Sequence, residues 1–135
     1  ELFNTPGHTT GVISIRYKVR EGEREYTAMT LGGVGLNFSG VERTETYINS
    51  YERLQSIQEG TSVSLPNHAA MGKVFARRDL LAIREGGEAN PFVNPDSYKK
   101  DLSAFLSAAK IKLKQEKSGT APTAVEALTK AITDS

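Results

Sequence analysis

The chain has 135 residues, a formal net charge of +1 and an apolar content of 38%, which suit one ordinary domain with a modest core. Acidic and basic residues are mixed, no basic stripe is interleaved with aromatic residues, and no apolar run could span a bilayer, so we expect neither nucleic acid nor a membrane as a partner. The sequence has no cysteine, which excludes disulfides and thiolate ligands for zinc.

The first part of the chain predicts a β-hairpin. Residues 12–19 alternate between apolar and polar side chains, which is typical of a half-buried strand. Residues 21–23 supply a turn, and residues 25–31 return with side chains that favour strands. The apolar face of the first strand carries Ile13, Ile15, Tyr17 and Val19.

A glycine-rich stretch follows at residues 32–35. Such stretches occur in phosphate-binding loops, but the Gly-Lys-Ser/Thr continuation of those loops is missing here. We therefore expect the glycines to serve a turn with unusual backbone angles, or the close approach of the backbone to a ligand.

The middle of the chain predicts a helix over 43–58, a short strand over 61–65 and a second helix over 73–84. Gly60 is a candidate C-cap of the first helix, and residues 86–87 end the second. The apolar face of the first helix is formed by Tyr47, Ile48, Tyr51 and Leu54. The apolar residues of the second are Val74, Phe75, Leu80, Leu81 and Ile83.

Asn94 and Pro95 predict the start of a long third helix, as an N-cap followed by proline at the first helical position. Its apolar stripe is formed by Tyr98, Leu102, Phe105, Leu106, Ala109 and Leu113. The lysines near its end suit the helix dipole, and we interpret them as a solvated face: Lys110, Lys112, Lys114 and Lys117.

A hinge over 118–122 and a last short helix complete the predicted order β-β-α-β-α-α-α. The last helix carries Val125, Leu128 and Ile132 on its apolar side. This order predicts an α/β fold with about half a sheet and helices on one of its faces.

The sequence has two histidines, His8 and His68. Each is placed where a strand ends and a tight turn begins, and such loops commonly carry binding and catalytic groups. A neutral imidazole is the commonest metal ligand in proteins. Two surface or hydrogen-bonded loop histidines are the alternative interpretation, which the spacing alone leaves open.

The residues around the histidines resemble a known family. Residues 5–11, Thr-Pro-Gly-His-Thr-Thr-Gly, resemble the third metal-binding motif of the metallo-β-lactamase superfamily. The stretches Gly-Gly-Val-Gly-Leu-Asn-Phe at 32–38, Leu-Pro-Asn-His at 65–68 and Glu-Ala-Asn-Pro-Phe-Val at 88–93 follow in order. Together they resemble the C-terminal half of class B, subclass 3 metallo-β-lactamases, over about Thr5 to Ala109.

The resemblance implies roles for three residues. His8 would be a ligand of the first of two zinc ions and His68 a ligand of the second, and Ser39 would help to bind the substrate carboxylate. A serine in such a position is more often a plain loop or capping serine, which is the alternative interpretation of Ser39. The family's principal signature, HxHxDH, cannot be present because the chain has no further histidine. Two histidines fall short of the three protein ligands that catalytic zinc usually has.

We therefore expect residues 1–135 to form the C-terminal half of an αβ/βα four-layer sandwich. The complementary N-terminal half, carrying HxHxDH, would be the partner, and the apolar face with Ile13, Ile15 and Tyr17 would need it as cover. The start at Glu1, without methionine, suggests cleavage, a split gene product or a nicked enzyme. The chain alone is expected to be inactive.

The function implied by the resemblance is zinc-dependent hydrolysis of a small molecule, foremost a β-lactam ring, by a zinc-bound hydroxide. Another hydrolase of the same fold, such as a lactonase or phosphodiesterase, is one alternative. A metal-free structural or interaction module is the other. The family also implies a periplasmic or secreted location.

Overall fold

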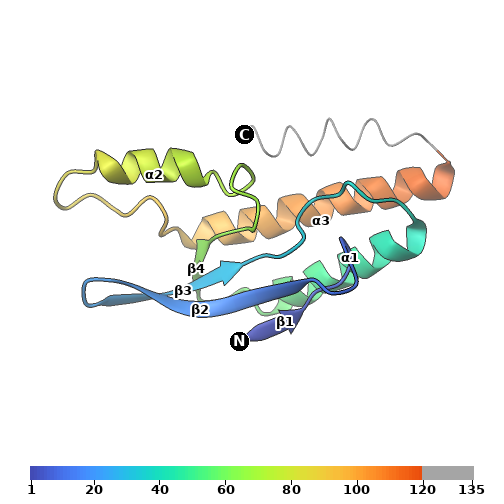
Figure 1. Ribbon diagram of the computed structural model, residues 1–135, viewed down its shortest axis with the longest axis horizontal. Coiled ribbons are helices and arrows are strands. Elements are labelled where there is room, and N and C mark those ends of the chain that lie inside the picture. Colours follow the sequence, from blue (N-terminus) through green and yellow to red (C-terminus); the bar gives the residue numbers. More distant parts are fainter. Residues whose placement is uncertain (120–135) are drawn as a thin grey trace.

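The computed structural model describes residues 1–119, which form a four-stranded sheet and three helices (Figure 1). The predicted α/β class is confirmed. No helix among these residues is long and apolar enough to cross a membrane. The elements are β1 (Leu2–Asn4), β2 (Ile13–Glu21), β3 (Arg24–Thr30), α1 (Val41–Ser56), β4 (Thr61–Ser64), α2 (Val74–Ala82) and α3 (Pro95–Ser118).

The sheet has the strand order β1-β2-β3-β4. β2 runs antiparallel to both β1 and β3, and Ile15 pairs with Leu2 on one side and with Thr30 on the other. β4 runs parallel to β3, with Met29 opposite Ser64. The C-terminal ends of β1, β3 and β4 therefore meet at one end of the sheet, and the β2–β3 turn lies at the opposite end.

One face of the sheet is covered by α1 and α3, which lie side by side in Figure 1. The predicted stripe of α1 is buried, and the rings of Tyr47 and Tyr51 stack with their centroids 4.2 Å apart. Asn94 caps α3 as predicted, since its side chain accepts a hydrogen bond of 2.9 Å from the Asp96 amide. The core also takes in Met29, Leu31, Leu102, Phe105 and Ala109.

Lys112 departs from the solvated face predicted for the lysines of α3, whereas Lys110, Lys114 and Lys117 are exposed as predicted. Lys112 is only 2% exposed and pairs with Glu116 at 2.9 Å. Lys110 pairs with Glu52 at 2.9 Å, and Lys117 pairs with Glu45 at 2.8 Å. The pairs of Lys110 and Lys117 join α3 to α1, whereas the pair of Lys112 lies within α3.

The other face of the sheet carries an exposed apolar row. Ile13 is 50% exposed, Ile15 39% and Tyr17 36%, and Leu2 lies beside Ile15 on the neighbouring strand. The side chains that alternate with them, such as Ser14 and Arg16, face the helices. Within residues 1–119, the helices therefore leave one apolar sheet face without cover, as the alternating pattern of residues 12–19 predicts.

Three elements differ from the sequence prediction. β1 was not expected, because three residues are too few for a periodic pattern. Gly60 does not cap α1; the helix ends at Ser56 with Ile57 as cap, and Gly60, with φ of 79°, serves the turn before β4. α2 buries none of its residues, and Figure 1 shows it beyond the N-terminal end of α3. The predicted last helix lies outside the described residues.

Candidate metal centre

Three loops meet at the end of the sheet where β1, β3 and β4 finish. They are residues 5–12, which contain His8, residues 31–40, and residues 65–73, which contain His68. The Asn67 amide donates a hydrogen bond of 2.8 Å to the Leu31 carbonyl, which ties the second loop to the third. The fold thus brings both histidines to one end of the sheet, although they lie far apart in the sequence.

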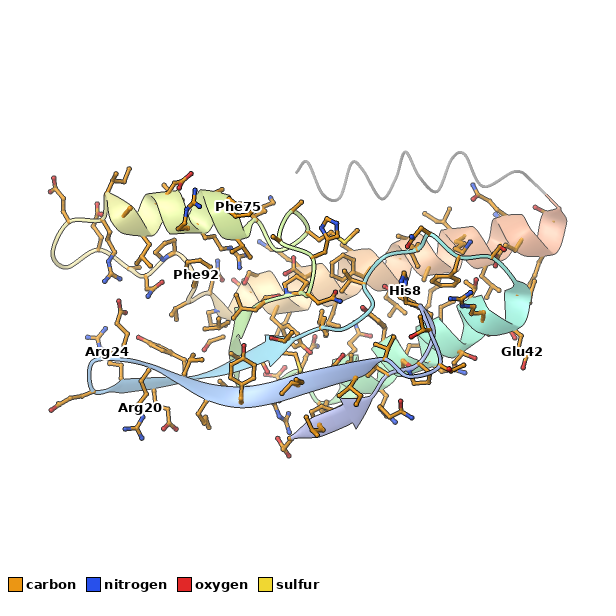
Figure 2. The ribbon with its side chains drawn as sticks, viewed as in Figure 1. His8, Arg20, Arg24, Glu42, Phe75 and Phe92 are labelled. Carbon is orange, nitrogen blue, oxygen red and sulfur yellow. The ribbon has the colours of Figure 1, made fainter. Side chains whose placement is uncertain are left out.

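The His8 ring has a fixed orientation. Its Nδ1 atom lies 2.8 Å from the carbonyl oxygen of Gly35, and its ring meets the Phe38 ring edge-on, with centroids 6.0 Å apart. A carbonyl oxygen only accepts, so Nδ1 carries the proton in this hydrogen bond and Nε2 of the neutral ring keeps its lone pair. Histidines that bind metals commonly have this arrangement, with the second nitrogen bonded to a carbonyl or carboxylate. Figure 2 shows His8 against the connection that leaves β3.

The glycines at residues 32–35 allow the connection after β3 to pass close to the His8 loop. Gly33 has φ of 56°, and a Cβ atom there would lie 2.8 Å from the Cβ of His8. A Cβ on Gly35 would lie 2.9 Å from Asn37 Oδ1 and 3.7 Å from the His8 ring. The predicted unusual backbone angle is confirmed at Gly33, and the close approach is to His8 of the same chain, so a phosphate-binding role is not needed to explain the glycines.

One stripe of α1 holds the backbone that leads to His8. Ser50 donates to the Pro6 carbonyl at 2.7 Å, and Arg53 donates to the Asn4 carbonyl. Arg43 donates through Nε to the Gly7 carbonyl at 2.9 Å and through Nη2 to the His8 carbonyl. Four carbonyls between Asn4 and His8 therefore accept hydrogen bonds from side chains of α1, which fix the path of the backbone to His8.

His68 is exposed on its loop. Its carbonyl accepts a hydrogen bond of 3.1 Å from the Gly72 amide, which closes the turn behind it. The prediction that the two imidazoles share one metal centre remains a prediction, and their placement at the same end of the sheet is consistent with it.

Below the His68 loop lies a half-buried carboxyl group, Asp101. It accepts a hydrogen bond of 2.6 Å from Ser64, whose carbonyl in turn accepts one of 3.1 Å from Arg77. Burial raises the pKa of Asp101, and the bond from Ser64 and the charges of Arg77 and Lys73 offset this only in part. This network joins the end of β4 to α3 and fixes the base of the loop.

Ser39 is exposed and lies just before Gly40, the N-cap of α1, so it is not itself the capping residue. The Oδ1 atom of Asn37 lies beside Gly35, the residue whose carbonyl bonds His8. Sequence reasoning missed Asn37, the Gly35 carbonyl and Arg43. The glycine-rich stretch pointed to Gly35 in the sequence. Nothing in the sequence marks Asn37 or Arg43, whose roles depend on the fold.

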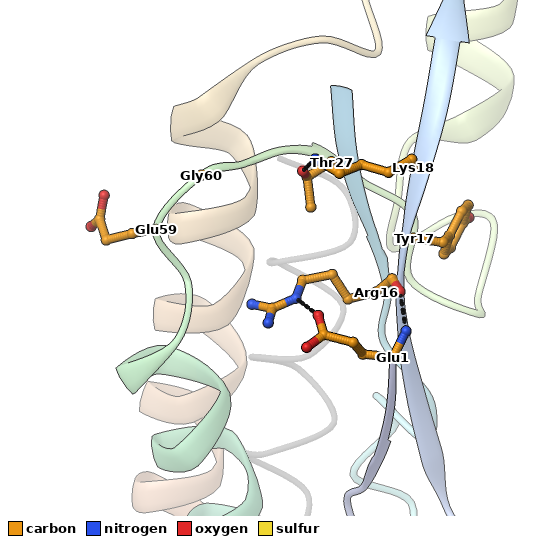
Figure 3. A pocket seen from close by; sticks show the side chains of 7 residues that line it. All are labelled: Glu1, Arg16, Tyr17, Lys18, Thr27, Glu59 and Gly60. Atoms are coloured by element: carbon orange, nitrogen blue, oxygen red, sulfur yellow. Dashed lines mark hydrogen bonds and ion pairs between the residues drawn. The ribbon is translucent and has the colours of Figure 1, made fainter. Parts of the chain in front are cut away.

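A hollow of about 410 Å³ lies elsewhere, around the middle of β2 and the turn before β4 (Figure 3). Glu59 and Gly60 precede β4, so this part of its lining is at the end of the sheet opposite the histidines. Its polar groups already pair: Arg16 with Glu1 at 2.6 Å, Lys18 with Thr27 at 2.9 Å, and Glu59 with Lys99 at 2.8 Å. We assign it no part in the candidate site.

The donor chemistry at His8 fits zinc, but the ligand set is incomplete. Within residues 1–119, no three His, Cys, Asp or Glu side chains gather in a group that could hold a metal ion. Zinc in catalytic sites usually has three protein ligands. The described residues can therefore supply part of a zinc site, and not the whole of one.

No protein-family model matches the sequence, and no curated protein matches it either. Solved structures do. The native metallo-β-lactamase FEZ-1 from Legionella gormanii has 26% sequence identity and a TM-score of 0.74, and the match covers 86% of this chain and 45% of that one.

BJP-1, a subclass B3 metallo-β-lactamase of Bradyrhizobium japonicum, has 18% identity and a TM-score of 0.72 over 87% of this chain and 46% of its own. The metallo-β-lactamase SMB-1 has 16% identity and a TM-score of 0.71 over 86% of this chain and 46% of its own. The chain spans about half the length of each. The resemblance seen in the sequence is thus confirmed: over most of its length, the chain has the fold of about half of a subclass B3 metallo-β-lactamase.

Proposed function

We propose that this chain is the C-terminal half of a zinc-dependent hydrolase of the metallo-β-lactamase type, with the β-lactam ring as substrate. The observation that carries the proposal is the His8 imidazole, whose Nδ1 is held by the Gly35 carbonyl at 2.8 Å at the end of the sheet where His68 also lies. This arrangement leaves Nε2 free to bind a metal, on a fold similar to that of known metallo-β-lactamases.

His8 and His68 would hold zinc from this half, and the remaining ligands would come from a complementary N-terminal half that carries HxHxDH. Zinc, when bound, would act as a Lewis acid toward the substrate carbonyl and lower the pKa of water toward neutrality. The Gly35 carbonyl keeps the His8 proton on Nδ1, and the tethers from α1 keep the ring in place. Ser39 and Asn37, both exposed on the loop beside His8, are the candidates for substrate contact.

The exposed apolar row supports the need for a second half. Ile13, Ile15 and Tyr17 face away from the helices, and each Å² of such surface removed from water contributes about 25 cal/mol. A complementary half that covered this face would gain that free energy on assembly. The chain also spans only about 45% of the FEZ-1 chain that it resembles.

A fold alone does not determine the substrate, so a lactone or a phosphodiester is the alternative within the same chemistry. A metal-free structural or interaction module is the alternative outside it. We propose a periplasmic or secreted location, since this is the location implied by the resemblance to subclass 3 enzymes.

The test uses the chain assembled with a complementary half that carries HxHxDH. We expect two zinc ions per assembled enzyme and turnover of a β-lactam in preference to a panel of lactones and phosphodiesters. His8→Ala and His68→Ala should each lower the zinc content and the turnover, with a far smaller effect on the melting temperature. Asn67→Ala, an exposed residue next to His68, is the control and should leave both unchanged.

Turnover of another ester with normal zinc content would replace the β-lactam by that substrate. An assembled protein that takes up no zinc would refute the enzyme and favour a structural module.

A further inference from the structure

We propose that Arg43 is a positioning residue for His8: its guanidinium holds the peptide of His8 so that the imidazole stays on the Gly35 carbonyl. The importance of this role for zinc rests on the proposed function. The role itself concerns the metal-free protein, and the two can be tested apart.

Arg43 donates hydrogen bonds to two successive backbone carbonyls, one before and one after the Cα atom of His8. Its Nε donates to the Gly7 carbonyl at 2.9 Å and its Nη2 donates to the carbonyl of His8 itself. The planar guanidinium presents these two donors in a fixed fork. The bonds fix the peptide planes before and after the His8 Cα, and therefore the direction of its side chain.

The same guanidinium also acts on the ring that borders His8. Its Cζ lies 4.8 Å from the centre of the Phe38 ring, within the range of a cation–π contact. Phe38 in turn meets the His8 ring edge-on at 6.0 Å and 83°. Arg43 therefore contacts His8 through its backbone and through its aromatic neighbour.

Arg43 can hold His8 in place because the N-terminal end of its own helix, α1, is bonded to α3. Glu116 accepts hydrogen bonds from Thr44 at 2.6 Å and from the Gly40 amide at 3.0 Å, and it pairs with the buried Lys112 at 2.9 Å. Lys112 also lies 5.2 Å from the centre of the Phe38 ring. The first turn of α1 is thereby fixed in the core, and Arg43 transmits that position to the His8 loop.

Arg53 provides a matched control. It lies on the same stripe of α1 and donates to the carbonyl of Asn4, the last residue of β1 before the His8 loop, and not to His8 or Gly7. A general need to tether the loop would make Arg43 and Arg53 equivalent. A positioning role would make only Arg43 matter to the imidazole.

The experiment compares Arg43→Met, Arg43→Lys and Arg53→Met in the full chain assembled with its complementary half. The first readout is taken without metal: the ¹⁵N chemical shifts of the His8 ring at a pH where the ring is neutral, which report the Nδ1-protonated tautomer. The second is zinc affinity from competition with a chelator. The third is the midpoint of urea unfolding, which shows that each variant folds.

We expect the wild type and Arg53→Met to hold a single Nδ1-protonated tautomer, and Arg43→Met to give averaged shifts of two tautomers. Arg43→Lys, which keeps the charge but loses the fork, should fall between them and serves if Arg43→Met fails to fold. Zinc affinity should drop about 10–100-fold in Arg43→Met, the range for groups that orient metal ligands.

A changed tautomer in a protein that binds no zinc would support the positioning role and refute the proposed function. Unchanged ¹⁵N shifts and zinc affinity in a folded Arg43→Met variant would overturn the proposal. Equal losses in Arg43→Met and Arg53→Met would also overturn it.

Discussion

The Nδ1 atom of His8 donates a hydrogen bond of 2.8 Å to the carbonyl of Gly35, and a Cβ atom at residue 35 would lie 3.7 Å from the His8 ring. The loop after β1 and the loop after β3 approach each other so closely that both Gly33 and Gly35 face His8 directly. The glycine-rich stretch is thus part of the support for the candidate ligand.

Alanine at the two glycines should have different effects. Gly33→Ala places a Cβ 2.8 Å from the Cβ of His8 and needs a left-handed backbone, so we expect a loss of about 1–3 kcal/mol in the free energy of unfolding. Gly35→Ala meets the flexible end of Asn37 at 2.9 Å and makes an ordinary contact of 3.7 Å with the His8 ring, so it should cost less free energy than Gly33→Ala. Urea unfolding of both variants checks this, and equal losses would contradict it.

The two stacked tyrosines of α1 offer a second comparison. The Tyr47 hydroxyl donates to the buried Val34 carbonyl at 2.9 Å, whereas the Tyr51 hydroxyl lies 3.5 Å from the Gly32 carbonyl. Tyr47→Phe leaves a buried acceptor unpaired, which costs about 1–3 kcal/mol. Tyr51→Phe loses a bond at the limit of hydrogen-bond length and should cost under about 1 kcal/mol. Thermal unfolding measures both, and an equal or larger loss in Tyr51→Phe would contradict the difference.

Local patterns predicted much of the fold, and some of the site. The alternation in residues 12–19 and the helical spacing of Tyr47 and Tyr51 arise from burial on one face, and burial leaves a periodic mark in the sequence. The cap formed by Asn94 is equally local, because its partner lies two residues away. His8 stood out because histidine is rare here and its motif is specific.

The features that were missed depend on contacts between distant segments. Lys112 is buried because Glu116 and Phe38 surround it, and a lysine at the end of an amphipathic helix gives no sign of such partners. The exposure of Phe75 on α2 has the opposite cause: its apolar pattern exists, but no described segment covers it. Arg43 could not be linked to His8 until the fold placed α1 against the loop.

Glu116 should make stability depend on pH. Burial alone would raise its pKa, but hydrogen bonds from Lys112, Thr44 and the Gly40 amide prevail, so its pKa in the folded protein lies below the ordinary 4.5. The stabilisation is therefore complete above the unfolded-state pKa and is lost as the pH falls through the folded-state pKa. Glu116→Gln should cost about 2–3 kcal/mol near pH 7, since it weakens bonds to a charged group, and should lose less stability than the wild type between about pH 5 and 3.

Urea unfolding at a series of pH values measures this difference. Glu52→Gln is the control, because Glu52 forms an exposed pair with Lys110 and such pairs contribute about 0–1 kcal/mol. A wild type and a Glu116→Gln variant with parallel pH profiles would contradict the role of Glu116.

The exposed sheet face should govern both the behaviour of the isolated chain and its assembly. Ile15 is 39% exposed in the middle of an apolar row with Leu2, Ile13 and Tyr17, whereas Ile111 is 42% exposed on α3, away from that face. Ile15→Thr keeps the β-branch that suits a strand while removing apolar surface. We expect it to lower hydrophobic-dye binding and aggregation of the isolated 135-residue chain, and to weaken its association with a complementary half carrying HxHxDH. Ile111→Thr removes as much apolar surface and should change neither.

Dye fluorescence, light scattering and titration of one half into the other measure these effects. Assembly favours the folded state by mass action, so the wild-type chain should also melt at a higher temperature when the complementary half is added. A sharp, reversible melt of the isolated chain that neither the added half nor zinc alters would show that the apolar row is not an assembly face. Equal effects of Ile15→Thr and Ile111→Thr would show instead that the amount of exposed apolar surface governs these effects. The position of that surface on the open sheet face would then not matter.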